Sequence, residues 1–188
     1  MLEILRHKTI GIAGCGGLGS NSAVALVRAG IGSLIIADYD TVEESNLDRQ
    51  YYFRTDIDKF KVDVLSEHLL AINPDVEIIA HNIELTPAII PKIFGNADIL
   101  IEAFDAAENK KWLIETWTKY FPDKPIICGN GIAGYGETDK LKVIKMGNIY
   151  FCGDEQTDSS IGLFSARVAI VANMQANVAI EILMERAE

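Results

Sequence analysis

The chain has 188 residues, a formal net charge of −10 at pH 7, and 49% hydrophobic residues. A chain of this length and apolar content can bury a sizeable core, so we predict a single domain over residues 1–188 that needs no disulfide for stability. The acidic balance argues against nonspecific binding of nucleic acid, because that affinity depends on clustered Lys and Arg side chains.

Targeting and membrane segments are not expected. The N-terminus lacks the small-residue cleavage site of a signal peptide, and the long apolar stretch at 161–184 is interrupted by charged and amide side chains from Arg167 to Glu181. Cys15, Cys128 and Cys152 are widely spaced, in apolar or glycine-rich contexts that favour reduced thiols. We therefore predict a cytoplasmic protein without a membrane partner.

Strand and helix patterns alternate along the first two-thirds of the chain. The predicted elements, in order, are a strand at 9–14, a helix at 20–30, a strand at 33–38, a helix at 60–73, a strand at 76–82, a weak helix at 87–95, a strand at 98–105, a helix at 108–121 and a strand at 124–131. This alternation is typical of a parallel sheet with crossover helices.

The pattern changes in the last third. Apolar runs at 141–146 and 149–152 are separated only by Gly147 and Asn148, a spacing that predicts a tight hairpin. A helix with an apolar stripe follows at 162–187. The predicted fold is thus α/β: a Rossmann-like, mostly parallel sheet with helices on both faces, which becomes mixed through a C-terminal antiparallel hairpin.

A glycine loop, GCGGLG at 14–19, lies between the first predicted strand and the first predicted helix. This is the context that the G-x-G-x-x-G motif requires, because the glycines let phosphate approach the backbone at a helix N-terminus. Asp38 ends the next strand, where an acid would bind ribose hydroxyls. We interpret Cys15 as a small packing residue. The candidate nucleotide-binding glycines are Gly14, Gly16, Gly17 and Gly19.

The polar residues that follow Asp38 favour a triphosphate. A dehydrogenase needs an open, largely uncharged slot for its nicotinamide ring, and Asn46 and Arg49 serve no such need. The outer phosphates of ATP extend beyond the glycine loop and need cationic and polar partners, which Asn46, Arg49 and Lys61 could supply. The stretch therefore favours ATP over NAD.

Acidic residues fit the same interpretation. A triphosphate brings Mg²⁺, which usually takes one or two carboxylate ligands in addition to phosphate oxygens. Asp105 lies at the carboxyl end of a predicted central strand, where ligands bind in open α/β sheets, and is the candidate magnesium ligand. For Asp40 and Glu43 a ligand role and a solvated-loop role both stay open.

Several motifs occur in order along nearly the whole chain. They are GCGGLGS at 14–20, D-Y-D at 38–40, SNLDRQ at 45–50, D-I-D-K-F-K at 56–61, I-N-P-D at 72–75 and the acid Asp105. Together they resemble the ThiF/MoeB/HesA family, relatives of the adenylating domain of ubiquitin-activating enzymes, and most closely the short ThiF-type proteins of thiamine biosynthesis.

The resemblance implies an adenylyltransferase that uses ATP and Mg²⁺ to activate the C-terminal Gly-Gly carboxylate of a small β-grasp sulfur-carrier protein, with release of pyrophosphate. It implies a homodimer. Carried over to this sequence, Asp38 would bind the ribose and Gln50 would line the site. Asn46, Arg49 and Lys61 would bind the phosphates and Asp105 would hold Mg²⁺, so the catalytic candidates are Arg49, Lys61 and Asp105. No general base is required, because a C-terminal carboxylate is already ionised.

The chain departs from the family pattern at three places. It has no CxxC pair, so we expect no structural zinc. Cys152 lies slightly early for the sulfur-handling cysteine of some relatives, so a nucleophilic role for it is only a hypothesis. Arg6 is the only arginine ahead of the first strand that could reach a neighbouring site in a dimer, and whether it does so stays open.

Alternative functions stay open at this point. They are activation of a molybdopterin-type carrier, of a peptide or of a modified RNA base, a Rossmann oxidoreductase that uses NAD, and a non-catalytic binding module. The glycine-rich loop at 129–139 would admit a narrow diglycine tail or serve as a flexible turn. Trp112 and Trp117, on one predicted helix, are interpreted as packing residues.

Overall fold

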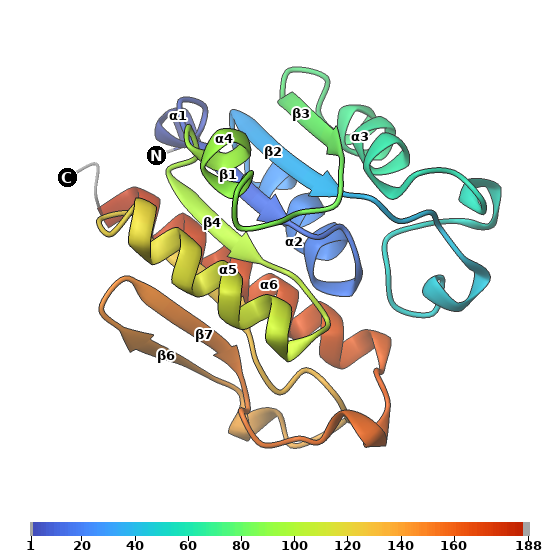
Figure 1. Ribbon diagram of the computed structural model, residues 1–188. Coiled ribbons are helices and arrows are strands. Elements are labelled where there is room, and N and C mark those ends of the chain that lie inside the picture. The colour runs from blue at the N-terminus through green and yellow to red at the C-terminus, as the bar shows by residue number, and fades with distance from the viewer. Residues whose placement is uncertain (1, 186–188) are drawn as a thin grey trace.

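The computed structural model describes residues 2–185 and contains one seven-stranded sheet in the order β3-β2-β1-β4-β5-β7-β6 (Figure 1). Neighbouring strands are parallel except for β6 and β7, which pair antiparallel across Gly147 and Asn148. The predicted Rossmann-like sheet that becomes mixed at the C-terminal hairpin is therefore confirmed. The strands are β1 (Thr9–Ala13), β2 (Ser33–Asp38), β3 (Glu77–Asn82), β4 (Ile99–Glu102), β5 (Ile126–Gly129), β6 (Lys142–Met146) and β7 (Ile149–Gly153).

Helices cover both faces of the sheet (Figure 1). One face packs against α2, α3 and α6, and the other against α4 and α5. In β2, Leu34 and Ile36 point into the first core while Ile35 points into the second, which explains why the strands read as unbroken apolar runs. The helices are α1 (Leu2–Leu5), α2 (Gly17–Arg28), α3 (Lys61–Ile72), α4 (Ile90–Phe94), α5 (Ala107–Tyr120) and α6 (Ser165–Glu185).

Several element boundaries differ from the sequence-based expectation. α2 begins at Gly17 rather than at residue 20, so half of the glycine loop lies inside the helix. β4 ends at Glu102 and β5 at Gly129, so Asp105 and Gly131 lie in the loops that follow these strands. α1 was not predicted. α6 begins at Ser165, and residues 186 and 187 of the predicted helix lie outside the described part.

α6 is long and apolar enough to cross a membrane by length and composition, so the expectation that its polar residues exclude this is wrong on those two criteria. Half of its apolar stretch is buried in the molecule, where α6 packs along α2. The Ser22 hydroxyl of α2 donates to the Ala172 carbonyl of α6 at 2.9 Å. Core packing therefore accounts for the composition of this helix.

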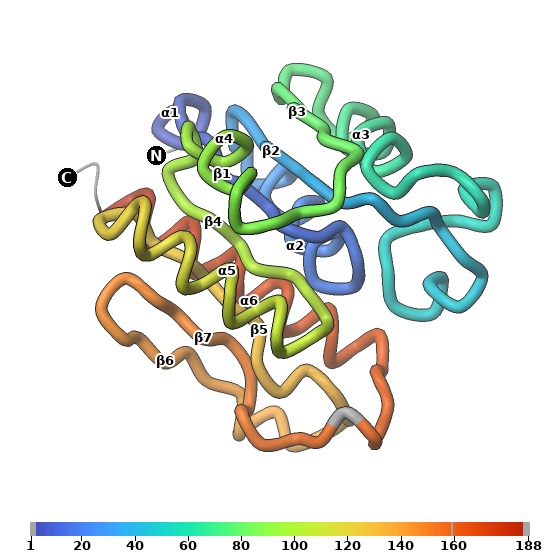
Figure 2. Tube along the Cα trace, in the orientation of Figure 1, coloured from blue at the N-terminus to red at the C-terminus, as the bar shows by residue number. Residues whose placement is uncertain are grey.

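Long connections gather at the carboxyl edge of the sheet. Residues 39–60 leave the end of β2 and reach α3 through two 3₁₀ turns, η1 (Glu44–Asn46) and η2 (Arg54–Asp56). Residues 130–141 and 154–164 contain η3 (Thr138–Lys140) and η4 (Ser159–Ile161). Figure 2 shows these connections on either side of the start of α2. They frame the region where ligands bind in this class of fold.

Candidate functional site

The glycine loop joins β1 to α2 at the point where the strand order reverses, between β1 and β4. Gly14 has φ 98°, and a Cβ atom there would lie 2.8 Å from the Ala103 carbonyl oxygen. A Cβ atom on Gly19 would lie 1.9 Å from the Gly14 carbonyl oxygen. Glycine is required at both positions, because the chain approaches itself too closely for a side chain.

The N-terminus of α2 is open to a ligand. Gly16 precedes the helix and, within residues 2–185, no side chain caps its first N–H groups. A Cβ atom on Gly16 would meet only Gln50 Nε2, at 3.7 Å. The free N–H groups and the helix dipole make this end of a 12-residue helix suited to an anion.

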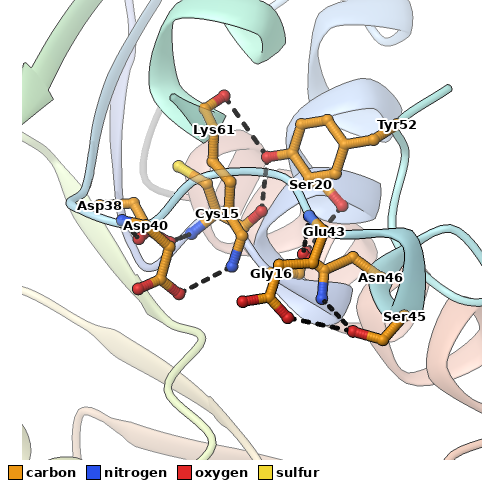
Figure 3. A network of polar contacts seen from close by, with 10 residues as sticks. All are labelled: Cys15, Gly16, Ser20, Asp38, Asp40, Glu43, Ser45, Asn46, Tyr52 and Lys61. Atoms are coloured by element: carbon orange, nitrogen blue, oxygen red, sulfur yellow. Dashed lines mark hydrogen bonds and ion pairs between the residues drawn. The ribbon is translucent and has the colours of Figure 1, made fainter. Parts of the chain in front are cut away.

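Asp38 stabilises the glycine loop directly (Figure 3). Its Oδ2 accepts a hydrogen bond from the Cys15 N–H at 2.6 Å, and its Oδ1 accepts one from the Asp40 N–H at 2.9 Å. Burial and, next, the Asp38 charge raise the pKa of Cys15 well above its usual range. The Cys15 thiol therefore stays protonated, as expected of a packing residue.

Tyr52 joins the 39–60 segment to the glycine loop, a role that sequence reasoning missed. Its hydroxyl donates to the Cys15 carbonyl oxygen at 2.7 Å and lies 3.5 Å from the Lys61 carbonyl oxygen (Figure 3). Burial, followed by nearby negative charge, raises the pKa of Tyr52. The hydroxyl therefore remains a donor. The pair of tyrosines directly after SNLDRQ, of which Tyr52 is the second, was the available signal.

A cavity of about 380 Å³ lies beside the glycine loop and brings together residues distant in sequence. Five predicted site residues line it: Gly14, Gly16, Asp38, Lys61 and Asp105. Asp40 also lines it, whereas Glu43 does not. The cavity combines an open helix N-terminus, a buried cation and carboxylates at the switch point of the sheet, which is an arrangement suited to a nucleotide and its phosphates.

Lys61 supplies the cation. It is the first residue of α3, its side chain is only 7% exposed, and its Nζ lies 2.8 Å from Asp40 Oδ2 (Figure 3). Its backbone N–H donates to the Asp40 carbonyl oxygen at 2.9 Å. The Asp40 carboxylate is half exposed, so it can turn into solvent and release the ammonium to a phosphate.

Asn46, Arg49 and Gln50 do not line this cavity. Asn46 is buried, and its Oδ1 accepts from the Glu43 N–H at 3.1 Å, so its side chain stabilises η1 (Figure 3). Arg49 Nη1 donates to the Ser45 carbonyl oxygen and to Asp48 Oδ1, at 2.8 and 2.6 Å. The roles assigned to these three residues stay predictions.

Arg49 and Gln50 nevertheless lie against the glycine loop. A Cβ atom on Gly17 would be 3.9 Å from Arg49 Cγ, which places Arg49 beside the first turn of α2. Asn21 Nδ2 donates to the carbonyl oxygens of Gly17 and Arg49 and so joins the two segments. Gln50 Oε1 is buried and has no hydrogen-bond partner in the described part of the chain.

Two further segments line the cavity without having been predicted. Residues 83–87 follow β3, Phe104 lies in the turn after β4, and Asn109 and Trp112 come from α5. Trp112, which we had interpreted as a packing residue, lines the cavity, and its ring lies 5.5 Å from that of Phe104. Trp117 is fully buried, as predicted. No motif marks these segments in the sequence.

Cys152 and Arg6 lie away from the cavity. Cys152 is buried in β7, and burial raises its pKa to about 12, which does not favour a nucleophile. Cys128 and Cys152 contribute to opposite cores. Arg6 precedes β1 and, with Arg28 and Asp75, lines a hollow of about 290 Å³ at the opposite edge of the sheet.

The glycine-rich loop after β5 is anchored by a buried ion pair. Gly131, Gly134 and Gly136 all have positive φ, and a Cβ atom on Gly131 would clash with Asp154. Arg167 Nη1 lies 3.2 Å from Asp154 Oδ2, and its Nη2 donates to the Gly136 carbonyl oxygen at 2.7 Å. Burial raises the pKa of Asp154, but hydrogen bonds and Arg167 outweigh it and lower the pKa. The loop is therefore tied to α6.

A larger hollow lies elsewhere. It measures about 1000 Å³ and runs between α6 and the β6–β7 hairpin, with Val143, Ile170 and Met174 in its walls. It contains no motif residue, so the smaller cavity at the glycine loop is the candidate functional site. Within residues 2–185 no three His, Cys, Asp or Glu side chains converge as a metal site. A magnesium ion would therefore need phosphate oxygens beside Asp105.

Comparison with known proteins agrees with this architecture. The adenylyltransferase and sulfurtransferase uba4 of Aspergillus niger is 37% identical over 134 residues, which make up 71% of this chain and 27% of that protein. The ubiquitin-like modifier-activating enzyme 5 of Caenorhabditis elegans is 43% identical over 84 residues, or 45% of this chain and 20% of that protein. The matched regions thus span about a quarter of these relatives.

Solved structures share the fold. The E. coli tRNA N6-threonylcarbamoyladenosine dehydratase TcdA, in complex with AMP, has a TM-score of 0.89 at 21% identity, covering 99% of this chain and 90% of that chain. E. coli MccB with ATP has a TM-score of 0.75 at 22% identity, covering 97% and 57%. The model of the ThiF family matches residues 1–188. The chain belongs to the ThiF family.

Proposed function

We propose that this protein is an ATP-dependent adenylyltransferase that activates the C-terminal carboxylate of a small carrier or modifier protein. One observation carries the proposal: a single cavity holds the open N-terminus of α2, Asp38, the buried Lys61 and Asp105. Family membership supports it, as do the adenylyltransferase name of the Aspergillus niger relative and the nucleotides in the TcdA and MccB structures.

The chemistry follows from these positions. A carboxylate oxygen of the carrier attacks the α-phosphorus of ATP and forms a bond to it. The bond from the α-phosphorus to the bridging oxygen breaks, and pyrophosphate leaves. The N–H groups of α2 stabilise negative charge on the phosphates, and Lys61 leaves Asp40 to neutralise more of it. Mg²⁺, with Asp105 as its protein ligand, would neutralise the leaving pyrophosphate. Asp38 accepts from the ribose while it stabilises the loop.

Phe104 and Trp112 form part of the wall that would contact the adenine base. We expect ATP or AMP to change the fluorescence of Trp112, because a bound base would displace water from an indole that lines the cavity. Trp117 is fully buried, so its emission serves as an internal reference. A titration with Trp112→Phe should lose the signal. An unchanged response in that variant would place the base elsewhere.

The carrier that we propose is a β-grasp protein ending in Gly-Gly, of the sulfur-carrier type used in thiazole synthesis. The resemblance to short ThiF-type proteins favours it over a molybdopterin-type carrier. Its narrow tail would pass the loop of Gly131, Gly134 and Gly136 at Gly136, where an added Cβ atom would meet nothing within 4 Å. By the same resemblance we propose that the protein is cytoplasmic and forms a homodimer. Light scattering can measure its oligomeric state.

Pyrophosphate–ATP exchange tests this function. We expect exchange by the wild type only when Mg²⁺ and the carrier are both present. Arg49→Ala should lower the rate about tenfold or more, because a charge-assisted contact to a phosphate is lost. The matched control is Arg54→Ala, on the same segment, where the side chain is 79% exposed and pairs with Glu44.

Other outcomes point to other functions. No exchange with the carrier, but exchange when a peptide or a modified RNA base is added instead, would favour that acceptor. ATP binding without exchange, with either a thiamine-type or a molybdopterin-type carrier, would favour a binding module. Tight NAD binding that is insensitive to Arg49→Ala would replace the proposal by an oxidoreductase.

A further inference from the structure

A fully buried carboxylate, Glu102, ends β4 just ahead of Asp105. Its Oε1 accepts a hydrogen bond from the Phe104 N–H at 2.7 Å. Both of its oxygens accept from Lys110 Nζ of α5, at 3.0 and 2.9 Å. One side chain therefore joins the end of a strand, the turn that follows it and the helix after the turn.

The main chain of Glu102 is fixed as well. Gln175 of α6 is fully buried, and its Nε2 donates to the carbonyl oxygens of Glu102 and Ile127, at 3.0 and 3.2 Å. The Glu102 carboxylate thus extends from an immobile point in the sheet. Because its length and direction are set, it determines where the Phe104 N–H and the start of α5 can lie.

The turn between β4 and α5, which Glu102 holds, lies against the glycine loop. The Ala103 N–H donates to the Ala13 carbonyl oxygen at 3.0 Å, and its carbonyl oxygen is the atom that excludes a side chain at Gly14. Asp105 itself is exposed and makes no hydrogen bond or ion pair with any residue in 2–185. Its orientation toward the cavity therefore depends on the residues on either side of it.

Stability alone does not explain a charged pair at this place. Burial raises the pKa of Glu102, although Lys110 and the Phe104 N–H act against that shift. Removing a carboxylate and an ammonium from water costs free energy that their attraction often fails to offset, and apolar residues could fill the same space. The strand end next to it, at Cys128, is apolar and buried. A role in positioning the turn after β4 would explain the pair of Glu102 and Lys110.

We infer that Glu102 is a positioning residue that fixes the turn between β4 and α5 and thereby directs Asp105 into the nucleotide cavity. The inference deepens the proposed function and rests on it for the role of Asp105. Glu102 does not line the cavity, so it acts on the turn through the Phe104 N–H and Lys110, while a further hydrogen bond from the Gly129 N–H anchors its carboxylate to β5.

Hydrogen exchange of the nucleotide-free protein tests the first half of the inference. Glu102→Leu removes both acceptors, and Lys110, with 23% of its side chain exposed, can then turn to solvent. We expect amide exchange in residues 103–109 to rise about tenfold or more, while α2 stays unchanged. Glu102→Gln keeps an acceptor for the Phe104 N–H and should stay close to wild type. Equal exchange in wild type and Glu102→Leu would overturn the inference.

ATP binding with and without Mg²⁺ tests the second half. Glu102→Leu should weaken Mg²⁺-dependent ATP binding about tenfold, the usual effect of losing a residue that orients a metal ligand. Adding Glu102→Leu to Asp105→Ala should cause no further loss, because one residue acts through the other. Additive losses would overturn the inference. A wild type that binds no ATP would overturn the proposed function instead, and hydrogen exchange would still decide whether Glu102 fixes the turn.

Discussion

Gly19→Ala should destabilise the protein by about 4 kcal/mol or more, or prevent it from folding, which is far outside the usual range for one methyl group. Gly19 lies inside α2, where alanine normally stabilises a helix by about 1 kcal/mol relative to glycine. Here the new Cβ would lie 1.9 Å from the Gly14 carbonyl oxygen, and the backbone of the loop would have to move. Urea unfolding followed by circular dichroism measures the change.

Gly16→Ala is the matched control for this prediction. A Cβ atom there has its nearest neighbour at 3.7 Å, but φ −80° and ψ −145° lie outside the main regions for a residue with a side chain, so we expect a loss of about 1–3 kcal/mol, smaller than that of Gly19→Ala. The same variant should bind ATP more weakly, because Gly16 lines the cavity. A Gly19→Ala protein as stable as Gly16→Ala would contradict the close approach at the glycine loop.

The pattern of the sequence predicted the fold well because helices cover both faces of the central strands. Leu34, Ile35 and Ile36 are all apolar for that reason, and such runs separated by amphipathic helices leave few alternative arrangements. The start of α2 was misplaced because Gly17 and Gly19 are poor helix formers, and tertiary contacts outweigh that preference.

The candidate site was predicted only where residues belong to a local motif. Gly14, Gly16 and Asp38 follow from the βαβ pattern, and Lys61 and Asp105 from their motifs and strand ends. Asn46 was predicted to bind phosphate, but its type and position equally suit the cap of a 3₁₀ turn, which is where its bonds go. The 83–87 segment and Trp112 join the site only through folding, so neither carries a local signal.

Asp105→Ala should lower carrier-dependent pyrophosphate–ATP exchange by about 10²- to 10³-fold, the usual effect of removing a group that stabilises charge at a reacting centre. Its free energy of unfolding should hardly change, because Asp105 is exposed and its carboxylate bonds to no residue in the described part of the chain. Exchange kinetics and urea unfolding of the same preparations measure the two effects side by side.

Glu108→Ala is the control for this variant. Glu108 is also exposed, lies in the first turn of α5 and carries the same charge, but it does not line the cavity. If Glu108→Ala lost as much activity as Asp105→Ala, the general negative potential at this end of α5 would account for both. If only Asp105→Ala lost exchange activity, and high Mg²⁺ partly restored it, the effect would be assigned to the Asp105 carboxylate itself. The Asp105 carboxylate forms no hydrogen bond or ion pair within the described residues, and it is therefore free to bind a ligand.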